Sequence, residues 1–439
     1  MKKLAYPTLL LALVIILGFV YNKHKSKINE APALKERPVN ISLASEWLNT
    51  KEAVEGLLDK IRRNPTDKKP KLQLAMAYVQ ESRVTGDHAY YDEAALKLVT
   101  AVLDKEPQNY EALCIKTTVL LSQHHFTEAL QEAENIVKLS PDAAFPYGLL
   151  CDAYVELGRY TEAVQAADKM NAIRPDLRSY SRIAYLREIH GDYKGAKEAM
   201  QFAVDAGIIG MEQTEWCRTQ LGKLCEITGD VTAAENHYKI ALEVRPDYAY
   251  ALAGMGRLAS QKGNYTEGVS LFEKAAKNVK DPAFYDEIAE IYLLDNQRVK
   301  AEDAAKKVID QLGGNLNASP NNKNNDASSL HGHYSDKEIA EAYLKLNDFP
   351  KAFVHAQAEY ERRPDNIDIN ELMAWTFYKK GEPEKALNYI EKALLTGSQN
   401  AALLWKAGTI YIKNNQIEKG NMLINKALLV NKHFKTETL

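Results

Sequence analysis

Histidine and cysteine are the residue types in this 439-residue chain that could support metal binding or nucleophilic chemistry. His331 and His333 stand two positions apart and could share one metal ion, with Asp326 and Asp336 as nearby carboxylates. Zinc sites usually need three or four ligands, and no obvious third ligand accompanies the histidine pair. We therefore expect a solvated, turn-forming loop at this position, with no metal and no cofactor.

Four cysteines are the other candidates for chemistry, and no two of them form a CxxC pair. They are Cys114, Cys151, Cys217 and Cys225. Free buried thiols are the simplest interpretation of this spacing. The sequence also lacks the GxGxxG, P-loop, GxSxG and HExxH motifs of common nucleotide-binding and hydrolytic sites. We expect no catalytic residue, so the chain is predicted not to be an enzyme.

Small residues recur at nearly constant spacing and define the elements that must position any functional side chain. The steps between them are 35, 34, 33, 38, 34, 33, 51, 34 and 34 residues, and the positions are Ala94, Ala129, Ala163, Ala196, Ala234, Gly268, Ala301, Ala352, Ala386 and Gly420. A second set of small residues lies twelve positions before most of them. A period near 34 residues is typical of stacked helix–turn–helix units, each of which buries its apolar face only against its neighbours.

Turn-forming residues agree with this register. Glycine lies five positions before several of the repeated small residues, at Gly158, Gly191, Gly229, Gly263 and Gly381. Asn347 and Asn415 take its place in two other units, and the pair His124-His125 takes it in a third. We expect these residues to end helices, because glycine and, less readily, asparagine adopt the left-handed backbone that closes many helices.

The pattern resembles the tetratricopeptide repeat, and residues 247–282 (DYAYALAGMGRLASQKGNYTEGVSLFEKAAKNVKDP) are its clearest copy. The resemblance covers roughly residues 53–430, as ten full units and one partial unit. Its C-terminal part, residues 333–430, is similar to the tail of many bacterial members of the family. The resemblance implies an all-α fold, a right-handed α–α superhelix, whose first helices generally line the concave face.

The ends and one interruption divide the chain further. We expect a signal anchor or transmembrane helix at residues 1–21, a tether at 22–41, one partial and seven full units at 42–312, an Asn-, Ser- and Gly-rich mobile loop at 313–333, three units at 334–431 and a tail at 432–439. Residues 4–21 carry no charge and could form a helix of about 27 Å. An uncleaved single-pass anchor is favoured over a removed signal peptide, with the repeats on the extracytoplasmic, periplasmic side.

The register also predicts a partner-binding groove on the concave face. Its expected residues are Asp152, Tyr185, Trp216, Lys223, Tyr250, Arg257, Glu290, Glu341 and Trp375. Aromatic anchors and charges suit a peptide or protein partner, so the leading hypothesis is a non-catalytic, membrane-tethered interaction scaffold. The alternative is an envelope assembly factor or carrier that transiently binds a polysaccharide or a nascent envelope protein. The net charge is −3 with no basic stripe, so no nucleic-acid partner is expected.

The last predicted helix, residues 417–430 (IEKGNMLINKALLV), is apolar nearly all round. Terminal repeats normally need a polar outer face. We therefore expect this end to contact a second subunit, a partner or the chain's own tail, so self-association through it is a prediction.

Overall fold

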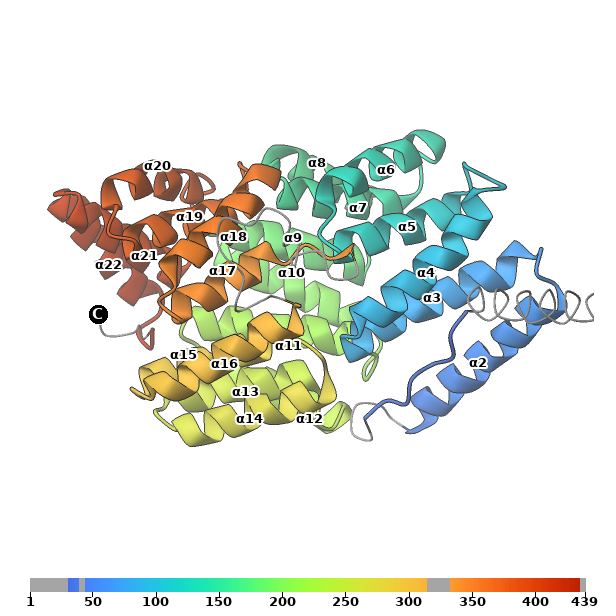
Figure 1. Ribbon diagram of the computed structural model, residues 1–439, viewed down its shortest axis with the longest axis horizontal. Helices are drawn as coiled ribbons and strands as arrows, with labels where there is room; N and C mark the ends of the chain where they lie inside the picture. Colours follow the sequence, from blue (N-terminus) through green and yellow to red (C-terminus); the bar gives the residue numbers. More distant parts are fainter. Residues whose placement is uncertain (1–30, 39–43, 314–331, 435–439) are drawn as a thin grey trace, which may run out of the picture.

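The computed structural model describes residues 31–38, 44–313 and 332–434. Within these ranges it contains 21 α-helices and no strand, which confirms the predicted all-α solenoid (Figure 1). Helix α2 precedes ten pairs, each made of a first and a second helix. The bounds are α2 Ala44–Arg63, α3 Lys68–Thr85, α4 His88–Leu103, α5 Tyr110–Ser122, α6 Phe126–Leu139, α7 Ala144–Glu156, α8 Tyr160–Ile173, α9 Leu177–Ile189, α10 Tyr193–Asp205, α11 Glu212–Ile227, α12 Val231–Val244, α13 Ala249–Gln261, α14 Tyr265–Asn278, α15 Ala283–Leu294, α16 Arg298–Gln311, α17 Asp336–Lys345, α18 Phe349–Arg362, α19 Ile367–Lys379, α20 Pro383–Ala393, α21 Ala401–Lys413 and α22 Ile417–Val430.

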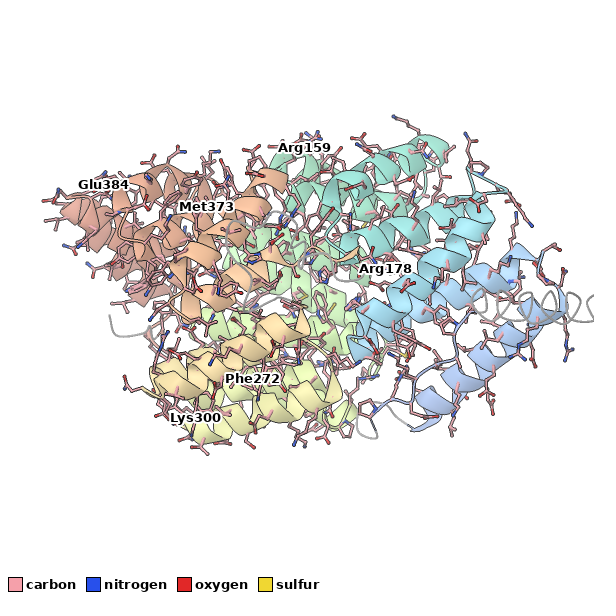
Figure 2. The ribbon with its side chains drawn as sticks, viewed as in Figure 1. Arg159, Arg178, Phe272, Lys300, Met373 and Glu384 are labelled. Atoms are coloured by element: carbon pink, nitrogen blue, oxygen red, sulfur yellow. The ribbon has the colours of Figure 1, made fainter. Side chains whose placement is uncertain are left out.

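Helices pack closely because small residues on one helix accept large residues from another. The Tyr238 ring of α12 is fully buried between two glycines of neighbouring first helices. A Cβ atom added at Gly222 or Gly254 would lie 2.6 or 2.4 Å from that ring. Phe272 of α14 is likewise fully buried, in the apolar layer that α13 to α16 share (Figure 2). The core therefore runs along the array as a continuous series of interfaces between adjacent helices.

The turns within units have the predicted backbone. All five glycines that the register places there have positive φ angles, between 77° and 86°. Asn347 and Asn415 adopt the same left-handed conformation, at 58° and 61°. His124 does so too, with φ of 62°, which confirms that the histidine pair ends a helix.

The array closes on itself, because turns within the early units meet linkers between the late units. Segments 193 to 211 residues apart in sequence are in contact, which corresponds to about six repeats. We call this line of contacts the seam. Five of its contacts, in order, are Thr85 with Lys280, Gln123 with Tyr334, Glu156 with Asn366, Gly191 with Gly397, and Glu226 with Asn431. Glu46 and Arg245, 199 residues apart, also form an ion pair at 2.9 Å. Each step along the seam advances one unit on both sides, so one superhelical turn rests on the next.

The predicted membrane location is corrected by the structure. No helix of the described residues is long and apolar enough to cross a bilayer. Residues 1–21, on which the prediction of an anchored protein with a periplasmic array depended, lie outside those residues, as does most of the predicted tether. Most of the loop predicted at 313–333 lies outside them as well.

Residues that follow the last helix pack against the repeats. Phe434 packs against the apolar cluster of the C-terminal units, and the Asn431 side chain donates to the carbonyl of Glu226 at 3.4 Å. Met422 and Leu429 on α22 stay 60% and 86% exposed. The tail contact that the sequence allowed is therefore present, and self-association through the exposed side stays a prediction.

Candidate functional site

The first helices lie on the inside of the curved array. Most consecutive first helices touch one another, such as α5 with α7 and α17 with α19. Consecutive second helices make no comparable contact within the described residues. Elements on the inside of a curve are closer together than those outside it, so the first helices line the concave side, as the resemblance implied.

Ion pairs join successive first helices along this side, and we call the whole side formed by the first helices the first-helix surface. The pairs and their shortest contacts are Asp152–Arg182 at 2.5 Å, Glu226–Arg257 at 3.0 Å, Arg257–Glu287 at 3.9 Å, Asp286–Lys345 at 2.9 Å, Glu290–Lys345 at 3.7 Å, Lys337–Asp368 at 3.8 Å and Glu371–Lys406 at 2.6 Å. Charges of opposite sign therefore alternate from one first helix to the next.

Two of the charged residues predicted for the groove are held in this surface by hydrogen bonds. Asp152 accepts two hydrogen bonds from the Arg182 guanidinium. Arg257 donates to both carboxylate oxygens of Glu226, at 3.1 and 3.0 Å, and also to the Tyr238 hydroxyl. A guanidinium held by a carboxylate and a hydroxyl is positioned by its neighbours rather than free to meet a partner.

Other predicted residues remain more open. The Tyr185 side chain is 41% exposed, and Lys223 is exposed and lies near Glu188 and Glu287. Glu290 is 43% exposed although it faces Lys345. These groups can still bind another molecule.

Carboxylates of the first helices are poorly solvated. Burial raises the pKa of Glu341 to about 7, although Lys337 and Lys345 lie near enough to oppose that rise. Burial likewise raises the pKa of Glu188 and Glu287. Desolvation disfavours the ionised form, so these side chains would gain from a further positive charge.

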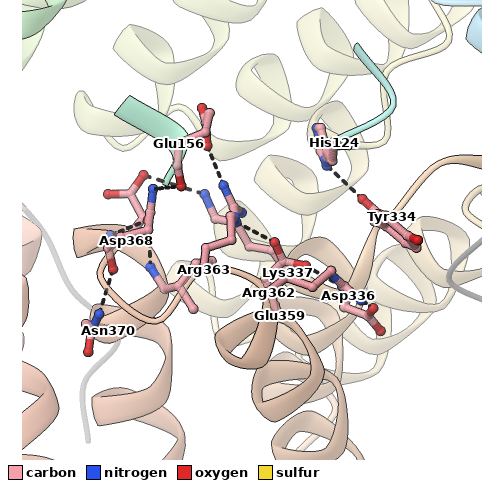
Figure 3. A network of polar contacts seen from close by, with 12 residues as sticks. His124, Glu156, Tyr334, Asp336, Lys337, Glu359, Arg362, Arg363, Asp368 and Asn370 are labelled. Carbon is pink, nitrogen blue, oxygen red and sulfur yellow. Dashed lines mark hydrogen bonds and ion pairs between the residues drawn. The ribbon is translucent and has the colours of Figure 1, made fainter. Parts of the chain in front are cut away.

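The seam meets the first-helix surface around Glu156 (Figure 3). Glu156 at the end of α7 forms an ion pair with Arg363, and its backbone carbonyl accepts from the Asn366 amide at 3.0 Å. The charges of Lys337 and Asp368 act on the same carboxylate. Burial raises the pKa of Glu156, and Arg363 opposes this rise.

Two parts of the chain match known repeats. Residues 120–188 and residues 228–283 each match a family model described as tetratricopeptide repeat. The chain contains tetratricopeptide repeats. Proteins with such repeats generally bind other proteins or peptides, so the repeats indicate an interaction scaffold.

Individual proteins are similar over different lengths. A crystal structure of a tetratricopeptide repeat protein from Parabacteroides merdae is 17% identical, covers 57% of this chain and 91% of its own, and has a TM-score of 0.33. The human IFIT1 dimer with PPP-AAAA is 16% identical, covers 79% of this chain and 77% of its own, and has a TM-score of 0.48. The probable UDP-N-acetylglucosamine–peptide N-acetylglucosaminyltransferase SPINDLY of Hordeum vulgare is 28% identical over 182 residues, 42% of this chain. The chain spans 16% of that relative's length. Such distant similarity does not establish the expected bacterial origin, and the absence of enzyme activity stays a prediction.

The aromatic residues predicted for the groove pack between repeats. Trp375 stacks on Tyr378 at 4.9 Å and also contacts Trp405. Tyr250 lies against Tyr248 and Phe284, at 5.6 and 5.9 Å between ring centroids.

Trp216 is half-buried like the other two, and the Arg83 guanidinium lies 5.5 Å from its ring. All three rings therefore already contact side chains of this protein.

The described residues of the candidate metal motif, His333 and Asp336, contact other side chains of the repeats. His331 and Asp326 lie outside the described residues. His333 lies at the seam, 4.4 Å from the His124 ring, and Asp336 binds His355 and Arg362. No group of three or more suitable side chains that could hold a metal ion occurs in the part of the chain that the structure describes.

The four cysteines are free and buried, as predicted. Burial raises the pKa of Cys151 and Cys217 to about 12 and that of Cys114 to about 11, so these thiols are poor nucleophiles.

Sequence reasoning missed Glu287 on the first-helix surface and most of the seam. Glu287 lies one helical turn before Glu290, so a wider face of α15 would have included it. The seam pairs Glu156 with Arg363, 207 residues away. A repeat period alone does not give the superhelical pitch, which decides which units meet.

Proposed function

We propose that the chain is a non-catalytic scaffold that binds a peptide or protein segment along the first-helix surface. The repeats support an interaction role, and the observation that carries the location is the set of partly exposed, poorly solvated carboxylates on α15 and α17. Glu287 and Glu290 are 39% and 43% exposed, while burial raises the pKa of Glu341 to about 7.

The partner segment carries lysine or arginine. A cationic side chain beside Glu287 or Glu341 would replace lost solvation and lower the pKa of each carboxylate. Of the two basic groups expected in the groove, Arg257 already binds Glu226, and Lys223 lies near the carboxylates of Glu188 and Glu287. Charge complementarity of this kind sets the specificity and the rate of association more than the affinity.

The polysaccharide alternative has less support. Sugar recognition by Trp216, Tyr250 and Trp375 would need open ring faces, yet Trp375 stacks on Tyr378 and Tyr250 lies against Phe284. The proposal therefore keeps a protein or peptide partner.

The test uses a short fluorescein-labelled oligolysine peptide and fluorescence anisotropy. We expect the triple variant Glu287→Gln, Glu290→Gln, Glu341→Gln to bind this peptide about tenfold more weakly at low salt, because three charged contacts are lost. Glu235→Gln is the matched control, since Glu235 forms ion pairs with Lys239 and Lys262 on the second-helix side.

The proposal is wrong if the triple variant binds oligolysine as tightly as the original protein. The proposal would also be contradicted if the original protein bound an oligoglutamate peptide as tightly as oligolysine, because that result would show no preference for positive charge.

A further inference from the structure

We propose that the seam is a releasable closure that controls access to the first-helix surface. The two superhelical turns would part along the seam while every helix pair stays folded. The control of access rests on the proposed function, whereas the release itself can be measured without any partner.

The seam consists of contacts between loops, and most of them are polar. Lys280 donates its backbone amide to the Thr85 carbonyl at 2.9 Å, and its ammonium group binds Asp87 at the same distance. Tyr334 donates its amide to the Gln123 carbonyl at 3.1 Å. Such contacts exchange readily for water and weaken in salt where they involve exposed charges.

Apolar contact across the seam is limited. Ile367 of α19 is buried in the apolar cluster of the first turn, and the His125 and Tyr334 rings lie 4.3 Å apart. In the described residues, no two helices more than two positions apart in the chain pack extensively against each other. Each helix pair, by contrast, shares a buried layer such as the one around Phe272. Breaking the seam would therefore expose Ile367 and little other apolar area, and its hydrophobic cost would be small compared with that of unfolding a unit.

Closure brings charged groups of the two turns together at the first-helix surface. Glu156 and Tyr185 belong to the first turn, and the charge of Asp368 in the second turn acts on both. Parting of the turns would move α19 away from α7 and α9. A partner that needs these side chains exposed would then bind the open form more tightly, which shifts the equilibrium toward opening.

Opening can be measured first in the absence of a partner. Glu156→Arg places two cations together at the seam, because Arg363 faces this position. We expect the radius of gyration from small-angle X-ray scattering to increase, with helical circular dichroism unchanged. Glu162→Arg is the matched control, since the Glu162 side chain is as exposed as that of Glu156 and pairs with Arg159 within one unit.

Access can be measured with a covalent lock. Gly158 lies against the backbone of Asp365, so cysteines at the neighbouring exposed position Arg159 and at Asp365 itself would be close enough for a short bismaleimide. Because the lock is added after folding, the same double variant without the reagent is its own reference. A second lock, between Glu235→Cys and Lys262→Cys, joins adjacent units within one turn.

The protein with a locked seam should bind oligolysine about tenfold more weakly than the unlocked double variant. The within-turn lock should leave the affinity for oligolysine unchanged. Equal binding with and without the seam lock would overturn the control of access and leave the proposed function standing. An unchanged radius of gyration in Glu156→Arg, or loss of helix together with expansion, would overturn release itself. Failure of the triple glutamine variant to weaken binding would count only against the proposed function.

Discussion

Contacts within a superhelical turn and contacts between turns are built from different chemistry. Within a turn, neighbouring helices bury apolar side chains, as around Phe272 and Tyr238, which are fully buried. Between turns, loops meet through backbone hydrogen bonds and ion pairs such as Glu156 with Arg363. Burial of apolar area dominates folding, so the first kind of contact stabilises the repeats and the second mainly sets their arrangement.

This difference means that the two sets of contacts should fail separately. A defect in a helix interface should unfold the units around it, because repeat arrays are stabilised by nearest neighbours. A defect in the seam should change the shape of the molecule and leave the helices intact.

The largest effect is expected from Phe272→Ala. Removing this fully buried ring leaves a cavity in the layer of α13 to α16 and should lower the free energy of unfolding by about 3–5 kcal/mol. Hydrogen exchange measured by mass spectrometry should accelerate in those four helices.

The control for Phe272→Ala is Phe202→Ala on α10, since the Phe202 side chain is 57% exposed. Its helices should keep their exchange rates. Faster exchange confined to the seam loops in Phe272→Ala would contradict the separation of the two kinds of contact.

Much of the fold could be predicted because local spacing determines it. The small residues at Ala234 and Gly268 and the turn at Gly263 repeat every 34 residues or so, and each reports on contacts within its own unit. The first-helix surface was predicted in part: Tyr185 and Lys223 are accessible, whereas Arg257 was not expected to be held by Glu226.

The seam could not be predicted from that spacing. Whether Gly158 meets Asp365 depends on the small rotation between units, accumulated over about six repeats. No single residue encodes that rotation, and the charge of Arg363 alone does not indicate which of many carboxylates it will meet.

The second prediction compares two glycines with the same backbone and different surroundings. Gly158 and Gly263 have φ of 77° and 86°, so alanine at either position costs about 1–2 kcal/mol. A Cβ atom at position 158 would lie 2.3 Å from the Asp365 backbone, whereas nothing lies within 4 Å at position 263. Gly158→Ala should therefore lower the free energy of unfolding by about 1 kcal/mol more, and it alone should expand the molecule.

Denaturant unfolding and small-angle scattering of both alanine variants decide this comparison. Equal stability loss together with equal radii of gyration would show that the contact of Gly158 with Asp365 does not hold the turns together.

The smallest effect concerns pH at the seam. Burial lowers the pKa of His124 from about 6.5 to about 4, and the positive charges of Arg363 and Lys337 lower it further. The Tyr334 carbonyl and Glu359 raise this pKa and oppose part of the shift. The unfolded chain therefore binds the proton first as the pH falls. Stability from neutral His124 is complete above about pH 6.5 and is lost progressively toward pH 4, by about 1–2 kcal/mol.

His124→Asn removes this titration and suits the left-handed backbone, because φ is 62° at this position. We expect the original protein to lose about 1–2 kcal/mol more than the variant between pH 7 and pH 4.5, measured by urea unfolding at each pH. Carboxylates with raised pKa values, such as Glu341, gain stability over the same range in both proteins. The difference therefore reports His124 together with its effect on the neighbouring His333 ring, 4.4 Å away. If the two proteins lose stability in parallel, the His124 contact with Tyr334 does not depend on a neutral ring, and acid would open the seam only through its ion pairs.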